Sequence, residues 1–278
     1  MPPVPEPSLV SFLSTERKLV EDPAIELIET LGWETASLFH EAPGPNNPTG
    51  RQSFKDAVLP KRLWAALWKL NPDLPDVALQ AAADALTQDR SAMLPVAANR
   101  ELASLLRDGV SVELRQDDGS TKPVRVILIN WTDPQANDFF LASQVWVESD
   151  LYKRRPDLAG FVNGIPLLLL ELKAPQEKLS EAYDKNLSDY RDTIPRFLHP
   201  NGFVILSNGH EAVMGSSHAE FEEFAAWKKL DEAEPDQAGL EIMLRATCER
   251  TRFLDLVENF VLFEEAKGGL RRAKQESG

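Results

Sequence analysis

The stretch RRPDLAGFVNGIPLLLLELKAP, residues 154–175, decides the fold. Its two apolar segments, DLAGFV and IPLLLLELK, flank an Asn-Gly dipeptide at 163–164, which strongly favours a β-hairpin. The second segment ends in the charged residues Glu171 and Lys173, and the first segment begins with a further carboxylate, Asp157. Because apolar strands seldom end in charge, we ask whether the hairpin brings these side chains together.

The register of the hairpin decides whether the two carboxylates meet. A strict two-residue turn, which pairs Val162 with Ile165, sends them to opposite faces of the sheet. A three-residue connection, which pairs Val162 with Pro166, makes them direct neighbours. Pro166 cannot donate a ladder hydrogen bond, so an irregular start to the second strand is expected. We therefore predict a bulged or three-residue connection, with Lys173 on the same face as the carboxylates.

Such a cluster has a definite chemistry. Two adjacent carboxylates repel each other unless a cation lies between them. Proteins commonly hold Mg²⁺ with one or two carboxylates together with waters and substrate phosphate. A neighbouring lysine can orient a water molecule or stabilise negative charge, and the whole set suits metal-assisted phosphodiester hydrolysis. The alternative interpretation is a surface hairpin whose charges protect an edge strand.

The rest of the chain predicts an α/β layer structure with a mixed sheet flanked by helices. Helical periodicity marks residues 11–33, 61–70, 76–88, 98–109, 179–198 and 251–266, and Pro23 suggests a kink, or a break between two short helices, in the first of these. Alternating or short apolar patterns predict strands at 111–116, 123–131, 138–149, 202–209 and 211–216.

Composition limits the possible functions. The formal net charge is −14 and the pI is near 4.8, which argues against a surface that attracts nucleic acid as a whole. A local phosphate site would therefore need metal ions or a partner protein. The single cysteine, Cys248, cannot form an internal disulfide. No run reaches the roughly 18 apolar residues of a membrane span, and no secretory signal is evident, so a cytoplasmic location without membrane association is expected.

The hairpin resembles the PD-(D/E)xK nuclease signature, read here as Pro156-Asp157 followed by Glu171-Leu172-Lys173. The ordered segments around it are similar to the N-terminal nuclease region of the R (restriction, motor) subunit of type I restriction-modification enzymes. These segments are NRELASLLRDGVSVEL, PQANDFFLASQVWV, YKRRPDLAGFVNGIPLLLLELKAP, NLSDY and GFVILSNGHEAVMGSSHAEFEEFAAWK. The resemblance covers roughly residues 10–265 and implies a restriction-endonuclease-like fold.

The resemblance implies a role for each matching residue of the signature. Asp157 and Glu171 would bind Mg²⁺, with the backbone carbonyl of Leu172 as a further ligand. Lys173 would assist the attacking water.

Two further elements of the family's site have candidates here. The Q-x-x-x-Y motif of the next helix runs from Asn186 to Tyr190, in which the tyrosine matches and asparagine replaces glutamine. Tyr190 can instead be an ordinary half-buried helix residue. Folds of this type often place an acidic residue of the first helix near the metal. Glu21 is the candidate, Glu16 and Glu26 are rivals at helical spacing, and a solvated helix charge is the alternative.

The function expected from the resemblance is a Mg²⁺-dependent DNA endonuclease module that acts after ATP-driven translocation by absent motor domains. The chain would be one nuclease domain over 1–278, with a flexible leader at 1–8 and a catalytic sheet core over about 110–215. A helical segment over about 240–278 would lead toward the motor. The sequence GPNNPTGR lacks the G-x-x-x-x-G-K-[ST] phosphate loop, so ATP is expected only in the motor domains.

The expected partners are double-stranded DNA and the methyltransferase and specificity subunits of a restriction complex. The isolated chain would then cleave DNA weakly or not at all. Two alternatives stay open: a stand-alone repair nuclease, and a nuclease-like module that binds DNA or docks other subunits without activity alone.

Overall fold

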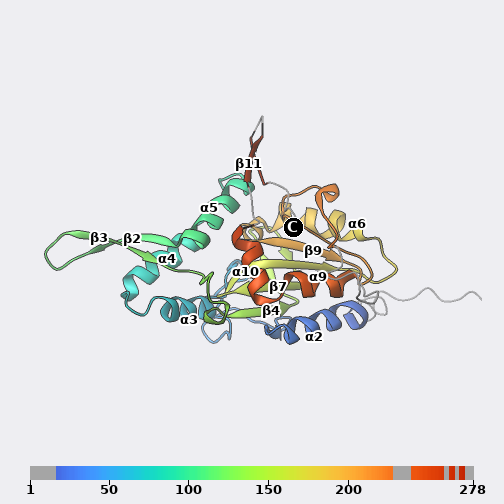
Figure 1. The fold of residues 1–278 in the computed structure, drawn as a ribbon, viewed down its shortest axis with the longest axis horizontal. Coiled ribbons are helices and arrows are strands. Elements are labelled where there is room, and N and C mark those ends of the chain that lie inside the picture. Colours follow the sequence, from blue (N-terminus) through green and yellow to red (C-terminus); the bar gives the residue numbers. More distant parts are fainter. Residues whose placement is uncertain (1–16, 228–238, 260–262, 267–268, 273–278) are drawn as a thin grey trace, which may run out of the picture.

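The centre of the molecule is a six-stranded mixed sheet in the order β1-β4-β7-β8-β9-β10 (Figure 1). This computed structural model describes residues 17–227, 239–259, 263–266 and 269–272. β1 pairs with β4 and β8 pairs with β9 in parallel, and the other neighbours are antiparallel. The predicted mixed sheet flanked by helices is confirmed. Its strands are β1 (Glu34–Ser37), β4 (Phe139–Ser143), β7 (Leu158–Val162), β8 (Ile165–Leu172), β9 (Phe203–Ser207) and β10 (Ala212–Gly215).

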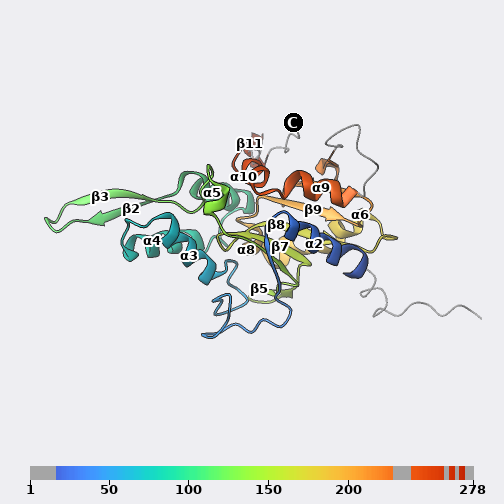
Figure 2. The same ribbon diagram turned by 60° about the horizontal axis from the view of Figure 1, so that its bottom comes forward.

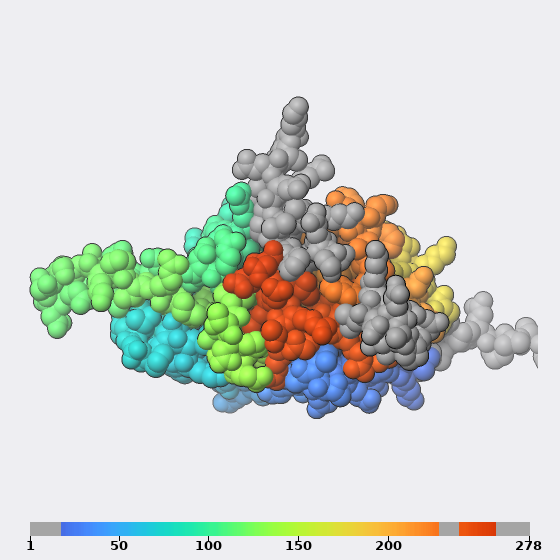
Figure 3. Space-filling model, in the orientation of Figure 1, coloured from blue at the N-terminus to red at the C-terminus, as the bar shows by residue number. Residues whose placement is uncertain are grey.

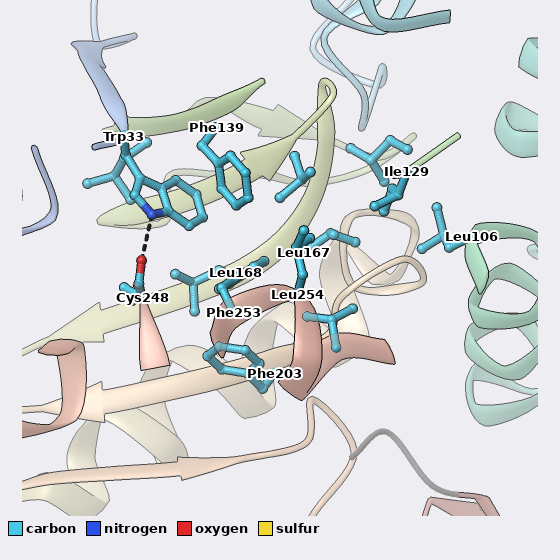
Figure 4. Packing of buried hydrophobic residues seen from close by; sticks show 14 of the residues in the cluster. Trp33, Leu106, Ile129, Phe139, Leu167, Leu168, Phe203, Cys248, Phe253 and Leu254 are labelled. Carbon is cyan, nitrogen blue, oxygen red and sulfur yellow. Dashed lines mark hydrogen bonds between the residues drawn. The ribbon is translucent and has the colours of Figure 1, made fainter. Parts of the chain in front are cut away.

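One face of the sheet is covered by three helices that lie side by side in the space-filling view (Figure 3). Trp33 packs edge-to-face on Phe139 and Phe253, with ring centroids 5.0 Å apart in both pairs. The Trp33 indole N–H also donates to the carbonyl of Cys248 at 2.8 Å (Figure 4), so this large buried ring has its polar atom satisfied. The three helices are α2 (Asp22–Thr30), α9 (Gly239–Thr247) and α10 (Arg250–Asn259).

A broken helical segment covers the opposite face. Its apolar side chains join those of alternate strand positions, such as Phe161 and Leu169, in a second buried cluster. The helical stretch predicted over 179–198 is confirmed, but it is interrupted at Ile194, which precedes a proline and leaves the helical region at φ −133° and ψ 46°. The pieces are α6 (Leu179–Glu181), the π-helix η3 (Ala182–Leu187), α7 (Ser188–Thr193) and α8 (Pro195–Leu198).

An arm of helices and a hairpin projects from one side of the sheet (Figures 1 and 2). The hairpin predicted between 111 and 131 is present, but it forms a separate two-stranded sheet. The central sheet instead recruits β1, so the expected sheet core over about 110–215 omitted one of its strands. The arm consists of α3 (Pro60–Leu70), α4 (Asp76–Thr87), α5 (Pro95–Asp108), β2 (Val110–Arg115) and β3 (Thr121–Val126).

Three other expectations differ from the structure. The single strand expected over 138–149 divides into β4 and β5 (Val147–Glu148), and β5 pairs with β6 (Lys153–Arg154). The helix expected over 251–266 ends at Asn259, and the strand β11 (Phe263–Ala266) follows and pairs with β12 (Gly269–Arg272). The sequence pattern did not separate the two, because a short apolar run fits a helix or a strand. The first helix has no mid-helix kink, since Pro23 lies at the start of α2.

The remaining elements are short. A π-helix, η1 (Arg17–Glu21), leads into α2, and two 3-10 turns are η2 (Pro134–Ala136) and η4 (Phe221–Glu223). Residues 1–16, including the expected leader and Glu16, lie outside the described residues. Within the described residues, no helix has the length and apolar character to cross a membrane.

Candidate active site

The signature residues gather at one edge of the central sheet. β4, β8 and β9 run in the same direction as β1, whereas β7 runs against them. The carboxyl ends of these four strands therefore share an edge with the start of β7. Asp157 immediately precedes β7. Glu171 is the last residue but one of β8, and Lys173 directly follows that strand. The backbone N–H of Lys173 donates to the carbonyl of Ser207 at 2.8 Å, which ties this end of β8 to β9.

A bulge sets the register between β7 and β8. Val162 pairs with Ile165 across a two-residue turn in which both central residues have positive φ, 52° and 76°. The register shifts between Gly160 and Phe161, because Leu167 is an extra residue on β8. The predicted bulged connection is confirmed, and the alternative three-residue turn is wrong.

After the bulge, the pairing brings Asp157 beside Glu171. Leu158 pairs with Leu170, so the next step along both strands places the two acidic residues next to each other. The backbone N–H of Asp157 donates to Oε1 of Glu171 at 3.4 Å, and the backbone N–H of Leu172 donates to Oδ2 of Asp157 at 2.9 Å. The two carboxylates therefore belong to one hydrogen-bonded unit.

The electrostatics of this unit combine a fully buried acid, Glu171, with a half-buried one, Asp157, and the charge of Lys173 acts on both. Glu171 is fully buried, and burial, followed by the charge of Asp157, raises its pKa well above its usual range; Lys173 opposes this rise. Burial also raises the pKa of Asp157, whereas the Leu172 N–H and Lys173 lower it. Oε2 of Glu171 is buried without a hydrogen-bond partner among the described residues. Such an oxygen is costly unless a cation or proton reaches it.

Tyr190 and Asn186 lie on the same side of the sheet as Glu171. Tyr190 is buried, and burial, then the charges of Glu171 and Asp157, raise the pKa of its phenol well above 10. A side-chain hydrogen bond with Asn186 acts in the opposite direction. Tyr190 is therefore a neutral phenol that interacts electrostatically with both carboxylates. Asn186, although shorter than glutamine, still reaches this phenol.

Glu21 approaches the site through an intermediary, Gln144. The Gln144 side-chain amide donates to both oxygens of Glu21, at 3.3 and 3.1 Å, and its backbone N–H donates to the carbonyl of Asp157 at 2.7 Å. Glu21 itself is buried, so the solvated-charge alternative does not describe it, whereas Glu26 is exposed. A direct role of Glu21 as a metal ligand stays a prediction.

Sequence reasoning missed Gln144. It adopts φ 58°, an uncommon left-handed conformation for a residue other than glycine. The turn after β4 directs the side-chain amide of Gln144 to Glu21 and its backbone N–H to Asp157. The one available signal was an amide placed directly after a predicted strand, within the segment ASQVWV, and that signal is weak alone.

The donor set suits a hard divalent cation. No three Asp, Glu, His or Cys side chains of the described residues form a group that could hold a metal. Mg²⁺ requires fewer protein ligands, because it retains several waters and is commonly held by one or two carboxylates. The partnerless Oε2 of Glu171 and the adjacent Asp157 fit that requirement.

Comparison with known proteins identifies the family. A family model described as the N terminus of the type I restriction enzyme R protein matches residues 14–223. The chain belongs to this family. It is 32% identical over 259 residues to the endonuclease subunit of the type I restriction enzyme HindI from Haemophilus influenzae. That match covers 90% of this chain and 24% of the relative.

A second relative agrees with this assignment. A protein of Methanocaldococcus jannaschii named as the endonuclease subunit of MjaIXP, a type I restriction enzyme, is 25% identical over 276 residues. That match covers 91% of this chain and 26% of the relative. The chain thus spans about a quarter of the length of the curated relatives it matches.

Proposed function

We propose that this chain is the Mg²⁺-dependent DNA endonuclease module of a type I restriction enzyme R subunit. One observation carries the proposal: the buried, partnerless Oε2 of Glu171 beside Asp157, at the carboxyl edge of the sheet, in a member of this family. A purely structural hairpin would gain nothing from placing the fully buried Glu171 beside a second carboxylate, since their repulsion is unfavourable without a cation.

The two carboxylates would hold the cation together with the backbone carbonyl of Leu172. Mg²⁺, when bound, would supply positive charge that polarises the phosphoryl group and makes the attacking water more acidic. The chain keeps Glu171 in place through the Asp157 N–H and keeps Asp157 in place through the Leu172 N–H. Both acids are thereby oriented before any substrate arrives, which favours catalysis by positioning.

Lys173 and Tyr190 would complete the chemistry on the same face. The ammonium group of Lys173 would orient the attacking water and stabilise negative charge on the phosphate oxygens. Tyr190, as a neutral phenol, can donate a hydrogen bond toward Glu171 without adding charge. Asn186 would position the phenol rather than touch the substrate.

The proposed partners follow from family membership and from length. Relatives about four times longer than the matched region leave room for motor domains that would use ATP and deliver double-stranded DNA. The methyltransferase and specificity subunits would supply sequence recognition. A module that receives DNA from partners can have a net charge of −14, because it does not need to attract DNA over its whole surface.

The test uses the full-length R subunit in the assembled enzyme. Asp157→Ala and Lys173→Ala should each abolish DNA cleavage while ATP hydrolysis persists. Lys185→Ala is the control, since Lys185 forms a surface ion pair with Glu181 at 2.6 Å, between η3 and α6. Robust cleavage by the Asp157 or Lys173 variant would refute the proposed site.

A second candidate, a docking module without activity, is favoured by the replacement of the family's glutamine with Asn186. Calorimetric titration of the chain with Mn²⁺ in the presence of DNA separates the two. Heat of binding that disappears in Asp157→Ala favours the nuclease, and no binding at millimolar metal favours the docking module.

A further inference from the structure

A row of three basic residues leads directly into the candidate active site. Lys153, Arg154 and Arg155 precede Asp157, and the first two form the short strand β6. Side chains alternate along an extended backbone, so Lys153 and Arg155 share one side and Arg154 takes the other. The contacts of the three side chains follow this alternation.

Arg154 is already occupied by another part of the chain. Its Nη2 donates to Oδ1 of Asp189 at 2.8 Å, and its Nε donates to the other oxygen, so the pair is bidentate. This pairing fastens β6 to α7, next to Tyr190. Arg154 is therefore a structural cation rather than a free one.

Lys153 and Arg155 lie over the same aromatic ring. The Lys153 ammonium is 5.0 Å from the centre of the Trp146 ring, and the Arg155 guanidinium is 5.1 Å from it. Lys153 also lies 4.0 Å from the ring centre of Phe54, and Arg155 lies 5.0 Å from that of Phe39. Cation–π attraction holds both charges in place at the surface without neutralising them.

The aromatic platform formed by Phe39, Phe54 and Trp146 is itself fixed. The Trp146 indole N–H donates to the carbonyl of Phe39 at 3.0 Å. Arg51, fully buried against Glu41, donates to the carbonyl of Trp146 at 2.9 Å. The segment after β1 thus lies against β5 (Figure 2) and holds the platform from behind.

The charge on the platform is only partly compensated. Lys153 forms an ion pair with Glu148 at 3.4 Å, and both side chains are partly exposed. Arg155 has no carboxylate ion-pair partner in the part of the chain that the structure describes. Arg155 is therefore a cation fixed in place beside the site, to which an anionic group of a substrate can bind.

We propose that Arg155 and Lys153, held over Trp146 and Phe39, bind the phosphate backbone of the DNA strand next to the bond to be cleaved. This inference rests on the proposed function and names the surface that presents the substrate. The cations cover the ring faces, so bases cannot stack there, and the contact is with phosphates, independent of sequence. Arg155, two residues from Asp157, would hold a flanking phosphate and thereby position the strand on the two carboxylates.

The experiment measures binding of a fluorescein-labelled DNA duplex to the full chain in Ca²⁺, by anisotropy, over a series of salt concentrations. Arg155→Ala should weaken binding several-fold and lower the slope of log K against log salt by about 0.9, the value for one phosphate contact. Arg155→Lys should keep the slope, which guards against a folding defect. Arg245→Ala is the control, since Arg245 pairs with Glu241 on α9, away from the site.

The outcomes separate this inference from the proposed function. In EDTA, where no cation can bridge the two acids to the DNA, Asp157→Ala should bind the duplex at least as well as the wild type, because it removes negative charge without touching the basic residues. If the assembled enzyme with Asp157→Ala still cleaves DNA but Arg155→Ala lowers the salt slope, the nuclease proposal falls and the binding surface stands. Equal binding by Arg155→Ala and Arg245→Ala overturns the inference, as does a wild-type chain that does not bind at low salt.

Discussion

Asp157 and Glu171 are neighbours because a single extra residue, Leu167, lies between the turn and the site. The two-residue Asn-Gly turn alone would have sent the carboxylates to opposite faces. The bulge restores the pairing, and the Asp157 N–H then donates to Glu171. The candidate site thus depends on a local irregularity of the strand as much as on the identity of its acids.

The metal-free chain should become more stable when Glu171 loses its charge. Glu171→Gln retains an oxygen for the Asp157 N–H but removes a buried negative charge beside another. We expect the free energy of unfolding in EDTA to rise by on the order of 1 kcal/mol or more. Addition of Mn²⁺ should raise the melting temperature of the wild type and leave that of Glu171→Gln unchanged. A variant that is less stable than the wild type in EDTA would contradict this account of the site.

Gln144 should matter for metal binding although it is no ligand. Gln144→Gly removes the amide that holds Glu21 while relieving the positive φ, so backbone strain cannot explain a loss. Loss of a partner that orients a ligand typically costs 10- to 100-fold in metal affinity, and we expect a decrease of about that size. Calorimetry with Mn²⁺ measures it, with Gln116→Gly at the exposed end of the β2–β3 hairpin as control. Unchanged affinity would leave Glu21 and Gln144 without a role in the site.

Much of the site could be predicted because its chemistry is concentrated in one hairpin. The Asn-Gly turn and Pro166, the second residue of β8, were visible in the sequence and together indicated a bulge in the hairpin that carries Asp157 and Glu171. The position of that bulge at Leu167 was not visible, because it follows from how β8 packs between β7 and β9. Resemblance to the family, rather than periodicity, supplied the candidates Asn186 and Tyr190.

Other features could not be predicted because they depend on contacts between distant residues. β1 has only four residues and joins the sheet through β4, more than 100 positions away along the chain. The conformation of Gln144 depends on Glu21 and Asp157, which come from two other elements. The strand β11 shares its apolar pattern with the helix before it, so its pairing with β12 decided its conformation.

Gly164 should tolerate alanine far less than another glycine of similar backbone conformation. Its φ is 76°, and an added Cβ would lie 2.6 Å from the carbonyl oxygen of Leu59 and 2.8 Å from the backbone nitrogen of Leu63. Gly119, at φ 83° in the β2–β3 turn, has open space around the same position. Both substitutions introduce strain of about 1 kcal/mol, and only Gly164→Ala adds a clash with backbone atoms. Urea unfolding should therefore show a clearly larger loss of unfolding free energy for Gly164→Ala than for Gly119→Ala. Equal losses would mean that the hairpin can move away from α3.

His199 should make the chain sensitive to acid. Burial, followed by the charges of Arg90 and Arg196, lowers the pKa of its imidazole from 6.5 to about 4. The folded chain therefore resists protonation that the unfolded chain accepts. The corresponding stability is fully present above pH 6.5 and is lost as the pH falls toward 4. The free energy of unfolding that is lost over this pH range is on the order of 3 kcal/mol. Urea unfolding at pH 7 and at pH 4.5 measures it, and His199→Gln, which cannot be protonated, should lose less stability between these two values than the wild type. Equal losses in the two proteins would show that His199 is not protected from protonation in the folded chain.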